Sequence, residues 1–304
     1  MRALVLPQYG GPESLTTAEL PKPRPAAGQL VVRTAGAAVN PVDLLTRTGA
    51  LAEHIGLPFP MILGWDLSGV VTEVGEGVTR FSAGDRVVAM SAQMGSGAGT
   101  YAEFVALDAA AVAPAPHGDD LASAAALPLA GLTAHQALDA LALQPGSTLL
   151  VSGAVGSVGG FAVQIAVARG IRVVAHVRPG EGEHDLALSL GAESVVPSDQ
   201  PVPGGIADAL LETAGIPDQV IGGVRDNGRA VSVYAPNPPK EERGIGVSQC
   251  FVVEDGDRLA ALSALVDEGV LTLRVAQRFG LADGAEAHRR LEAGGVRGKL
   301  LLIP

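Results

Sequence analysis

The stretch V-S-G-A-V-G-S-V-G-G at residues 151–160 has the residue types that a dinucleotide phosphate needs. An apolar run precedes it and a helix-forming run follows it, so the small residues fall where a buried strand turns into a helix. The N-terminus of such a helix presents unpaired N–H groups, and small residues let a pyrophosphate approach the backbone. Gly156 and Gly159 match the pattern G-x-G-x-x-G, whereas Ala154 stands at its first glycine. A methyl group is tolerated there if the φ angle of Ala154 stays negative.

The alternative is a strand–helix connection that binds nothing. The strand, turn, helix and next strand follow one another within about 30 residues, which is the context that this fingerprint requires. We therefore expect Gly156 to allow the phosphate close and Gly159 to allow tight packing of the helix on the strand. Ser157 and Val158 are expected to donate backbone N–H groups to the phosphates.

The end of the second strand indicates which dinucleotide the turn would bind. NAD sites usually have Asp or Glu there, to bind the ribose 2′-hydroxyl. Here residues 173–180 read V-V-A-H-V-R-P-G, with His176 and Arg178 and with no carboxylate before Glu181. A guanidinium matches a 2′-phosphate in charge and geometry, so the sequence predicts NADPH. The alternative for Arg178 is an ordinary solvated arginine on a loop.

Composition excludes several other classes of protein. The 304 residues are 47% hydrophobic and 17% charged, which is typical of a compact globule. A net charge of −11 without a basic block argues against nucleic-acid binding. Cys250 is the only cysteine, which excludes an internal disulfide and a cysteine-built zinc site. The N-terminal apolar run is too short for a signal peptide, and Pro128, His135 and Asp139 interrupt the apolar region 121–143. We expect a cytoplasmic protein that does not enter the membrane.

The elements that must position the turn differ between the two halves of the chain. The first 115 residues contain short β-rich runs separated by Gly and Pro, at Arg2–Leu6, 29–37, 67–73, Arg86–Met90 and 102–106.

From residue 121 the pattern changes to helices and then to alternating strands and helices. Parallel strands buried on both faces have this pattern, so the middle of the chain is expected to be a doubly wound α/β domain. The predicted helices are 121–143, 156–169, 184–190 and 285–292, and residues 197–205 are predicted to form a loop. The predicted strands are Thr148–Ser152, 171–177, 194–196, Ala207–Glu212, 229–233, 250–253 and Lys299–Ile303.

Further blocks of sequence carry a family resemblance. They are Y-G-G-P-E (9–13), A-A-V-N-P-V-D (37–43), F-P-M-I-L-G-W-D-L-S-G-V-V-T-E-V-G-E-G-V (59–78), F-S-A-G-D-R-V (81–87), G-T-Y-A-E-F-V (99–105), A-A-A-L-P-L-A-G-L-T-A-H-Q-A-L (124–138) and R-G-K-L-L-L (297–302). In these blocks the chain resembles the medium-chain dehydrogenase/reductase superfamily, specifically the zinc-independent quinone oxidoreductase branch that includes zeta-crystallin. The resemblance implies a GroES-like β-barrel domain from both chain ends, residues 1–120 and 270–304. It also implies a Rossmann domain at 121–269 that binds NADPH.

The residues at the metal positions of this superfamily predict that zinc is absent. Zinc-dependent relatives have a cysteine where this chain has Asn40, and Gly-His-Glu where it has Gly64-Trp65-Asp66. Neither Asn40 nor Trp65 is a good zinc ligand. The remaining chemistry is hydride transfer from the nicotinamide to an electrophilic carbon, as in a small apolar quinone or an α,β-unsaturated carbonyl. Such an acceptor needs orientation and a donor to its developing oxyanion.

The resemblance also implies individual roles. Asn40 lies near the nicotinamide ribose or the substrate and orients it, Thr133 contacts the cofactor, and Lys299 faces the cleft. The structural alternatives are that Asn40 caps a turn and that Thr133 satisfies a helix carbonyl. No residue is assigned as a general acid. The complete set of expected cofactor contacts is Asn40, Thr133, Ala154, Gly156, Ser157, Val158, Gly159, His176, Arg178, Val233, Tyr234, Phe251, Val253 and Lys299.

The chain departs from the family between residues 196 and 207, where relatives usually have a helix and a tyrosine on the adenosine side. Ser198 is the nearest replacement. The apolar loop 48–58 favours an apolar substrate. Two other functions remain open, an enoyl reductase for a thioester-bound or polyketide-type intermediate and a non-catalytic NADPH-binding structural protein. We expect a homodimer formed by edge strands near residues 250–253, and Tyr101, Asp66 and Asp85 to be structural.

Overall fold

A computed structural model describes residues 1–54, 56, 58–93, 97, 99–118, 120–233 and 236–304. The chain divides into two compact units. Unit 1 comprises Met1–Leu129, Val253–Gly269 and Leu273–Pro304, and unit 2 comprises Ala130–Val252 and Val270–Thr272.

These boundaries differ from the expected ones, because residues 121–129 and 253–269 belong to unit 1 and residues 270–272 belong to unit 2. Helix α7 (Gly256–Asp267) explains part of the difference. A Cβ atom at Gly256 would lie 2.5 Å from the carbonyl oxygen of Ala110, so the helix begins in close contact with unit 1. At its other end the Asp267 carboxylate accepts a hydrogen bond of 2.7 Å from the backbone N–H of His117.

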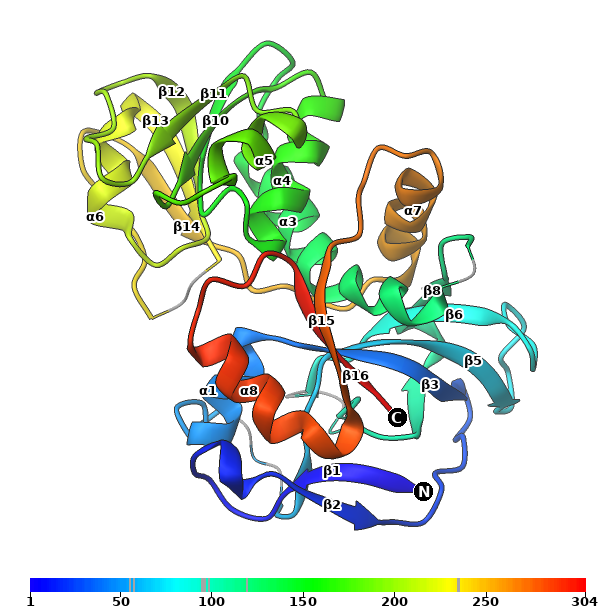
Figure 1. Ribbon diagram of the computed structural model, residues 1–304. Coiled ribbons are helices and arrows are strands. Elements are labelled where there is room, and N and C mark those ends of the chain that lie inside the picture. Colours follow the sequence, from blue (N-terminus) through cyan, green and yellow to red (C-terminus); the bar gives the residue numbers. More distant parts are fainter. Residues whose placement is uncertain (55, 57, 94–96, 98, 119, 234–235) are drawn as a thin grey trace. The chain divides into compact units, whose positions relative to one another are not determined.

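Unit 2 contains a six-stranded parallel sheet in the order β11-β10-β9-β12-β13-β14 (Figure 1). Numbered along the unit, this is the order 3-2-1-4-5-6 of a Rossmann fold, in which ligands bind beyond the carboxyl ends of the strands. The strands are β9 (Thr148–Ser152), β10 (Arg172–Val177), β11 (Ser194–Pro197), β12 (Ala207–Glu212), β13 (Val224–Ser232) and β14 (Gly246–Gln249). The helices are α3 (Pro128–Leu141, which begins in unit 1), α4 (Ser157–Ala168), α5 (Glu183–Ser189) and α6 (Pro217–Val220). No helix or strand lies between Pro197 and Ala207, so the predicted loop is confirmed.

The predicted strand at 250–253 is wrong. The last strand of this sheet is β14, and residues 250–253 follow it outside any strand. Phe251 and Val253 are 70% and 62% exposed. An apolar run resembles a buried strand in sequence, and only the tertiary fold decides whether it is covered.

Unit 1 is built on two sheets, and both chain ends contribute to it. The three-stranded sheet has the order β2-β1-β4, and the seven-stranded sheet has the order β15-β16-β3-β5-β6-β8, with β7 paired to β3. The C-terminal strand β16 runs antiparallel to β3, with Leu300 opposite Val39. This is the GroES-like part that the sequence predicts. The strands are β1 (Arg2–Leu6), β2 (Thr16–Glu19), β3 (Gln29–Val39), β4 (Met61–Ile62), β5 (Asp66–Val74), β6 (Arg86–Met90), β7 (Phe104–Asp108), β8 (Val112–Pro114), β15 (Val275–Gly280) and β16 (Lys299–Ile303).

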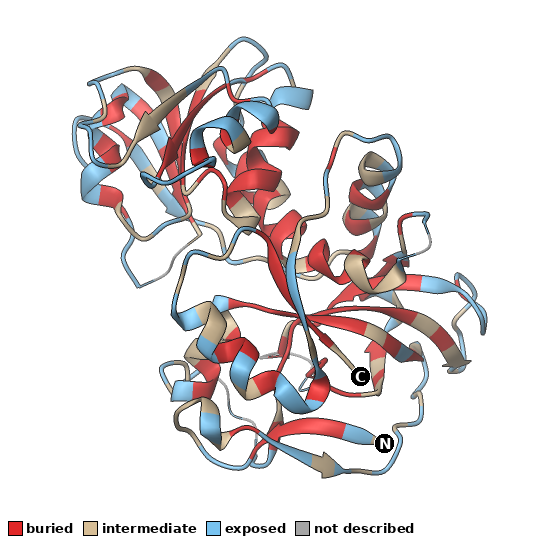
Figure 2. Cartoon of the chain, viewed as in Figure 1, coloured by how far each residue is buried: buried red, intermediate tan, exposed pale blue. Residues whose placement is uncertain are grey.

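Two further helices, α1 (Pro41–Thr48) and α8 (Gly284–Glu292), belong to unit 1. Short 3₁₀ turns complete the chain at Pro12–Ser14, Ala109–Ala111, Leu121–Ala126, Ile221–Gly223 and Leu281–Asp283. Burial is concentrated in the central strands of the six- and seven-stranded sheets and in helices α3 and α4, whereas β2, β14 and β15 are mostly exposed (Figure 2). Across the described residues, no helix has the length and apolarity that a membrane span requires.

Candidate functional site

The Gly-rich turn joins the end of β9 to the start of α4 in unit 2. Gly153 has a φ angle of +60°, which places the left-handed position one residue before Ala154. Ala154 is fully buried and is not among the described residues with positive φ, so its methyl group causes no backbone strain. Its N–H donates to the His176 carbonyl at 3.2 Å, which links the turn to β10. The missing first glycine is therefore compatible with the turn.

The other two glycines of the pattern have unequal amounts of space. A Cβ atom at Gly159 would lie 2.2 Å from the Gly153 carbonyl oxygen, so no side chain fits there. At Gly156 the same distance would be 3.0 Å, which is tight. Gly156 is the N-cap of α4, and Ser157 and Val158 form its first turn. All three are half-buried. The first turn of a helix next to small residues is suited to bind an anion.

His176 and Arg178 differ sharply in their surroundings at the end of β10. The His176 side chain lies within the strand and is 2% exposed. Burial lowers the pKa of its imidazole, so the ring is neutral at pH 7. Arg178 follows the strand and is exposed. Within the described part of the chain its guanidinium has no hydrogen bond or ion pair. Arg178 is thus the cation available near this strand end, whereas His176 offers no positive charge.

In unit 1, Asn40 and Lys299 lie in one buried cluster with Asp66. The Asn40 amide donates to the Asp66 carboxylate at 2.9 Å and to the Ala38 carbonyl at 3.1 Å. The Lys299 ammonium donates to the Asn40 side-chain oxygen and, at 3.1 Å, to the Asp66 carboxylate. Asp66 also accepts a 2.6 Å bond from the backbone N–H of Leu129. Both N–H bonds of the Asn40 amide are therefore in use, and its oxygen accepts from Lys299.

A second chain of buried contacts begins beside Asn40, which is also the N-cap of α1. The Asp43 carboxylate accepts from the Asn40 backbone N–H at 2.8 Å and from the Tyr101 hydroxyl at 2.9 Å. Tyr101 is 3.4 Å from His288 Nε2, and His288 Nδ1 is 3.5 Å from the Arg47 guanidinium. Arg47 in turn pairs with Glu292, which ties α1 to α8.

Burial sets the protonation of this chain. Desolvation raises the pKa of Asp43 to about 7, against hydrogen bonds from Asn40 and Tyr101 that lower it. Desolvation, helped by the Arg47 charge, lowers the pKa of His288 to about 3. Because Arg47 can only donate, His288 Nδ1 must accept, which leaves the proton on Nε2 facing Tyr101. The Tyr101 hydroxyl then donates to the Asp43 carboxyl group.

Asp43 and His288 are not among the site residues that the sequence predicts. The spacing N-P-V-D contains the signal for Asp43, because a residue three positions after an N-cap commonly binds back to it. No local signal marks His288, since its partner Tyr101 is 187 positions away in sequence. Asp85, expected to be structural, accepts from the backbone N–H of Ser82 at 2.8 Å in a surface turn.

The other predicted contacts are spread over both units. Thr133 is a buried residue of α3, and Val233 is half-buried directly after β13. Phe251 and Val253 are exposed. Tyr234 lies outside the described residues, as do residues 55 and 57 of the predicted apolar loop. The structure therefore brings together two groups within single units, namely Asn40 with Lys299 and the Gly-rich turn with the end of β10.

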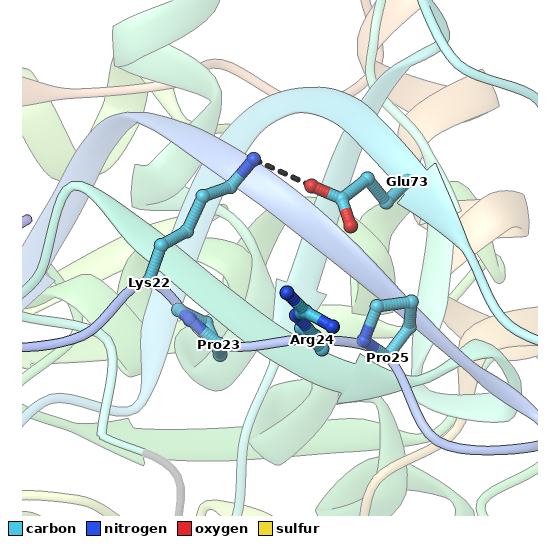
Figure 3. Close-up of a pocket in the computed structure, with 5 residues that line it drawn as sticks. All are labelled: Lys22, Pro23, Arg24, Pro25 and Glu73. Carbon is cyan, nitrogen blue, oxygen red and sulfur yellow. Dashed lines mark hydrogen bonds and ion pairs between the residues drawn. The ribbon is translucent and has the colours of Figure 1, made fainter.

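A surface hollow of unit 1 is separate from these groups. Lys22, Pro23, Arg24, Pro25 and Glu73 line it (Figure 3). The Lys22 ammonium is 2.6 Å from the Glu73 carboxylate and 4.5 Å from the centroid of the Phe104 ring. Its charge is therefore already paired, and the hollow contains none of the predicted site residues. Across the described residues, no group of three or more His, Cys, Asp or Glu side chains could hold a metal ion.

Known proteins resemble this chain over its whole length. Residues 26–117 match the alcohol dehydrogenase GroES-like domain, and residues 184–302 match the zinc-binding dehydrogenase family. A chloroplast envelope quinone oxidoreductase homolog from Arabidopsis thaliana is 30% identical over 331 residues, covering 100% of this chain and 98% of the relative. An NADPH-dependent alkenal/one oxidoreductase of the same plant, also chloroplastic, is 28% identical, covering 100% of this chain and 80% of the relative. The solved structure of an NAD-dependent alcohol dehydrogenase superposes with a TM-score of 0.88 at 32% identity, with both chains fully covered.

Proposed function

Because the chain belongs to the medium-chain dehydrogenase/reductase superfamily and to its quinone oxidoreductase branch, we propose that it is an NADPH-dependent reductase of quinones or α,β-unsaturated carbonyls that works without zinc. The observation that carries the proposal is the Gly-rich turn at the start of α4, followed by an exposed Arg178 in place of a carboxylate. Relatives with either nicotinamide cofactor resemble this chain. The preference between NADPH and NADH therefore depends on the residues at the end of β10.

The turn fits a dinucleotide. Gly153, Gly156 and Gly159 leave the backbone without side chains where a pyrophosphate would approach, and Ser157 and Val158 begin the helix. Arg178 would bind the 2′-phosphate with its unpaired guanidinium. When bound, NADPH supplies a hydride for an electrophilic carbon. The further contacts proposed for the cofactor are Asn40, Thr133, Ala154, His176, Val233, Tyr234, Phe251, Val253 and Lys299.

The cluster around Asn40 does not fit a zinc ion. Zinc-dependent members have their ligands at Asn40 and Trp65, neither of which suits zinc. Lys299 donates to both Asn40 and Asp66, so a positive charge already lies where a metal would need lone pairs. A quinone or enone is electrophilic without a metal, and orientation by Asn40 with a proton from solvent would suffice. We assign no general acid.

The proposal includes the assembly and location expected from the sequence. The edge strand β14 pairs with β13, and the exposed Phe251 follows it, which together support a homodimer formed at this edge. A cytoplasmic location remains a prediction, since both Arabidopsis relatives are described as chloroplast proteins.

Titration with NADPH and NADH tests the proposal, followed by absorbance at 340 nm with a small quinone and with a 2-alkenal. We expect tighter binding of NADPH and turnover of at least one acceptor. Arg178→Ala should weaken the binding of NADPH by about 1–3 kcal/mol, the size of a lost charge-assisted contact. It should leave the binding of NADH nearly unchanged. Arg172→Ala is the matched control, because Arg172 is exposed at the other end of β10.

Each outcome has a separate meaning. If neither nucleotide binds, the proposed function is wrong. Equal affinity of the wild-type protein for both nucleotides would remove the role of Arg178 but keep the reductase. Tight NADPH binding without turnover of either acceptor would favour the non-catalytic alternative.

A further inference from the structure

Glu212, the last residue of β12, has a fully buried carboxylate at the centre of a hydrogen-bond network in unit 2. Its Oε1 accepts from Ser152 Oγ at 3.0 Å. The same oxygen accepts from the backbone N–H groups of Ala214 at 2.9 Å and Ile216 at 3.1 Å. Its Oε2 accepts from Ser232 Oγ at 3.3 Å. Four donors thus converge on one side chain at the carboxyl edge of the sheet.

The donors belong to the segments that enter the proposed nucleotide site. Ser152 directly precedes Gly153 of the Gly-rich turn, and Ser232 directly precedes Val233. Thr213 adds a second link, because its N–H donates to Ser152 Oγ at 2.8 Å and its hydroxyl donates to the Ser152 carbonyl at 2.6 Å. A Cβ atom at Gly153 would lie 2.9 Å from the Thr213 hydroxyl oxygen, so loop 213–216 packs directly on the turn.

The chemistry of the network indicates a geometric role. Within the described part of the chain, every hydrogen bond to the Glu212 carboxylate comes from a hydroxyl or a backbone N–H, and no Lys or Arg pairs with it. Burying a carboxylate without a cation is costly, so packing stability alone does not account for this residue. A carboxylate is acceptor-only and can receive about four hydrogen bonds, which lets one side chain hold the ends of β9, β12 and β13 together.

We propose that Glu212 is the positioning residue of the dinucleotide site. It fixes the Gly-rich turn relative to loop 213–216 and to Val233, and thereby sets the spacing between the segments proposed for the phosphates and for the nicotinamide. The inference rests on the proposed nucleotide binding at the turn. These segments would contact parts that NADPH and NADH share, so Glu212 should affect both nucleotides equally, unlike Arg178.

Two substitutions separate the effect of the length of the Glu212 side chain from the effect of its charge. Glu212→Asp keeps the charge but is one methylene shorter, so it cannot contact Ser152 and both loop N–H groups together. We expect about tenfold weaker binding of both nucleotides, with the ratio of their dissociation constants unchanged. Glu212→Gln keeps the reach, because its amide oxygen still lies beside the same donors and its amide N–H can donate to Ser232 Oγ. We expect it to bind both nucleotides nearly as the wild type does.

Asp208→Ala is the matched control for stability. Asp208 lies at the amino end of the same strand and accepts a 2.7 Å bond from the backbone N–H of Thr148, so it also links β12 to β9. The substitution should lower the urea midpoint of unfolding without changing nucleotide affinity. A residue with a purely structural role would behave in this way.

The outcomes distinguish the inference from the proposed function. If the wild-type protein binds neither nucleotide, both are wrong. If the wild type binds and a folded Glu212→Asp binds equally well, only the inference is wrong. Weaker binding by Glu212→Gln than by Glu212→Asp would show that charge matters instead of reach, which also overturns it. If Glu212→Asp does not fold, Ser152→Ala takes its place, and unchanged affinity for both nucleotides in that variant overturns the inference.

Discussion

The pKa values of Asp43 and His288, which belong to one buried chain of contacts, are shifted in opposite directions. The pKa of Asp43 is raised from 3.8 to about 7, so the folded state holds an extra proton between these values. Acidification through that window therefore stabilises the fold. The pKa of His288 is lowered from 6.5 to about 3, so the unfolded state holds the extra proton and acidification destabilises the fold. From pH 6.5 to 3.8 the two effects oppose each other.

Removing either group should expose the effect of the other. In Asp43→Asn the free energy of unfolding should fall more steeply than in the wild type as the pH drops below 6.5. In His288→Asn the free energy of unfolding should rise relative to that of the wild type as the pH drops over the same range. A difference of one bound proton changes the free energy of unfolding by at most about 1.4 kcal/mol per pH unit. Urea unfolding at several pH values measures the slopes, and parallel curves for wild type and Asp43→Asn would contradict the assignment.

At the scale of the element, the turn between β9 and α4 has no room for a side chain at Gly159. Gly159→Ala would place a methyl group 2.2 Å from the Gly153 carbonyl oxygen, so the turn or the helix must move. We expect loss of NADPH affinity by more than about tenfold, together with a lower unfolding midpoint. Gly222→Ala is the control, since a Cβ atom there meets nothing within 4 Å. Nucleotide fluorescence titration checks both variants, and normal binding by Gly159→Ala would rule out this geometry.

How far sequence predicts an element depends on whether its determinants are local. The Gly-rich turn was predictable because small residues, a buried strand and a helix lie next to one another. The strand predicted at residues 250–253 is wrong, because an apolar run has the same sequence pattern whether or not a sheet covers it. The network of Asp43, Tyr101 and His288 joins residues 58 and 187 positions apart, so no local pattern contains it. Glu212 combines both cases, because Ala214 and Ile216 follow it closely in sequence, whereas Ser152 and Ser232 end other strands.

At the scale of the whole molecule, we place the proposed dimer contact at β14, the edge strand of the unit 2 sheet. Phe251 is exposed two residues after the end of β14, so Phe251→Glu should place a charge in the contact and shift the protein towards a monomer. Leu188→Glu is the control, because Leu188 is 41% exposed on α5 of the same unit. Light scattering during gel filtration gives the mass of each. A wild-type protein with the mass of a single chain would contradict the dimer.

The pairing of β16 with β3 has a consequence for how the chain is made. All six strands of the unit 2 sheet have been synthesised once Gln249 is added. At that moment β3 still lacks β16, which ends at Ile303, and Asp66 still lacks Lys299. Domains fold as units while the ribosome is still at work. Unit 2 can therefore fold on the nascent chain, whereas unit 1 must wait until β16 has been synthesised and has left the ribosome.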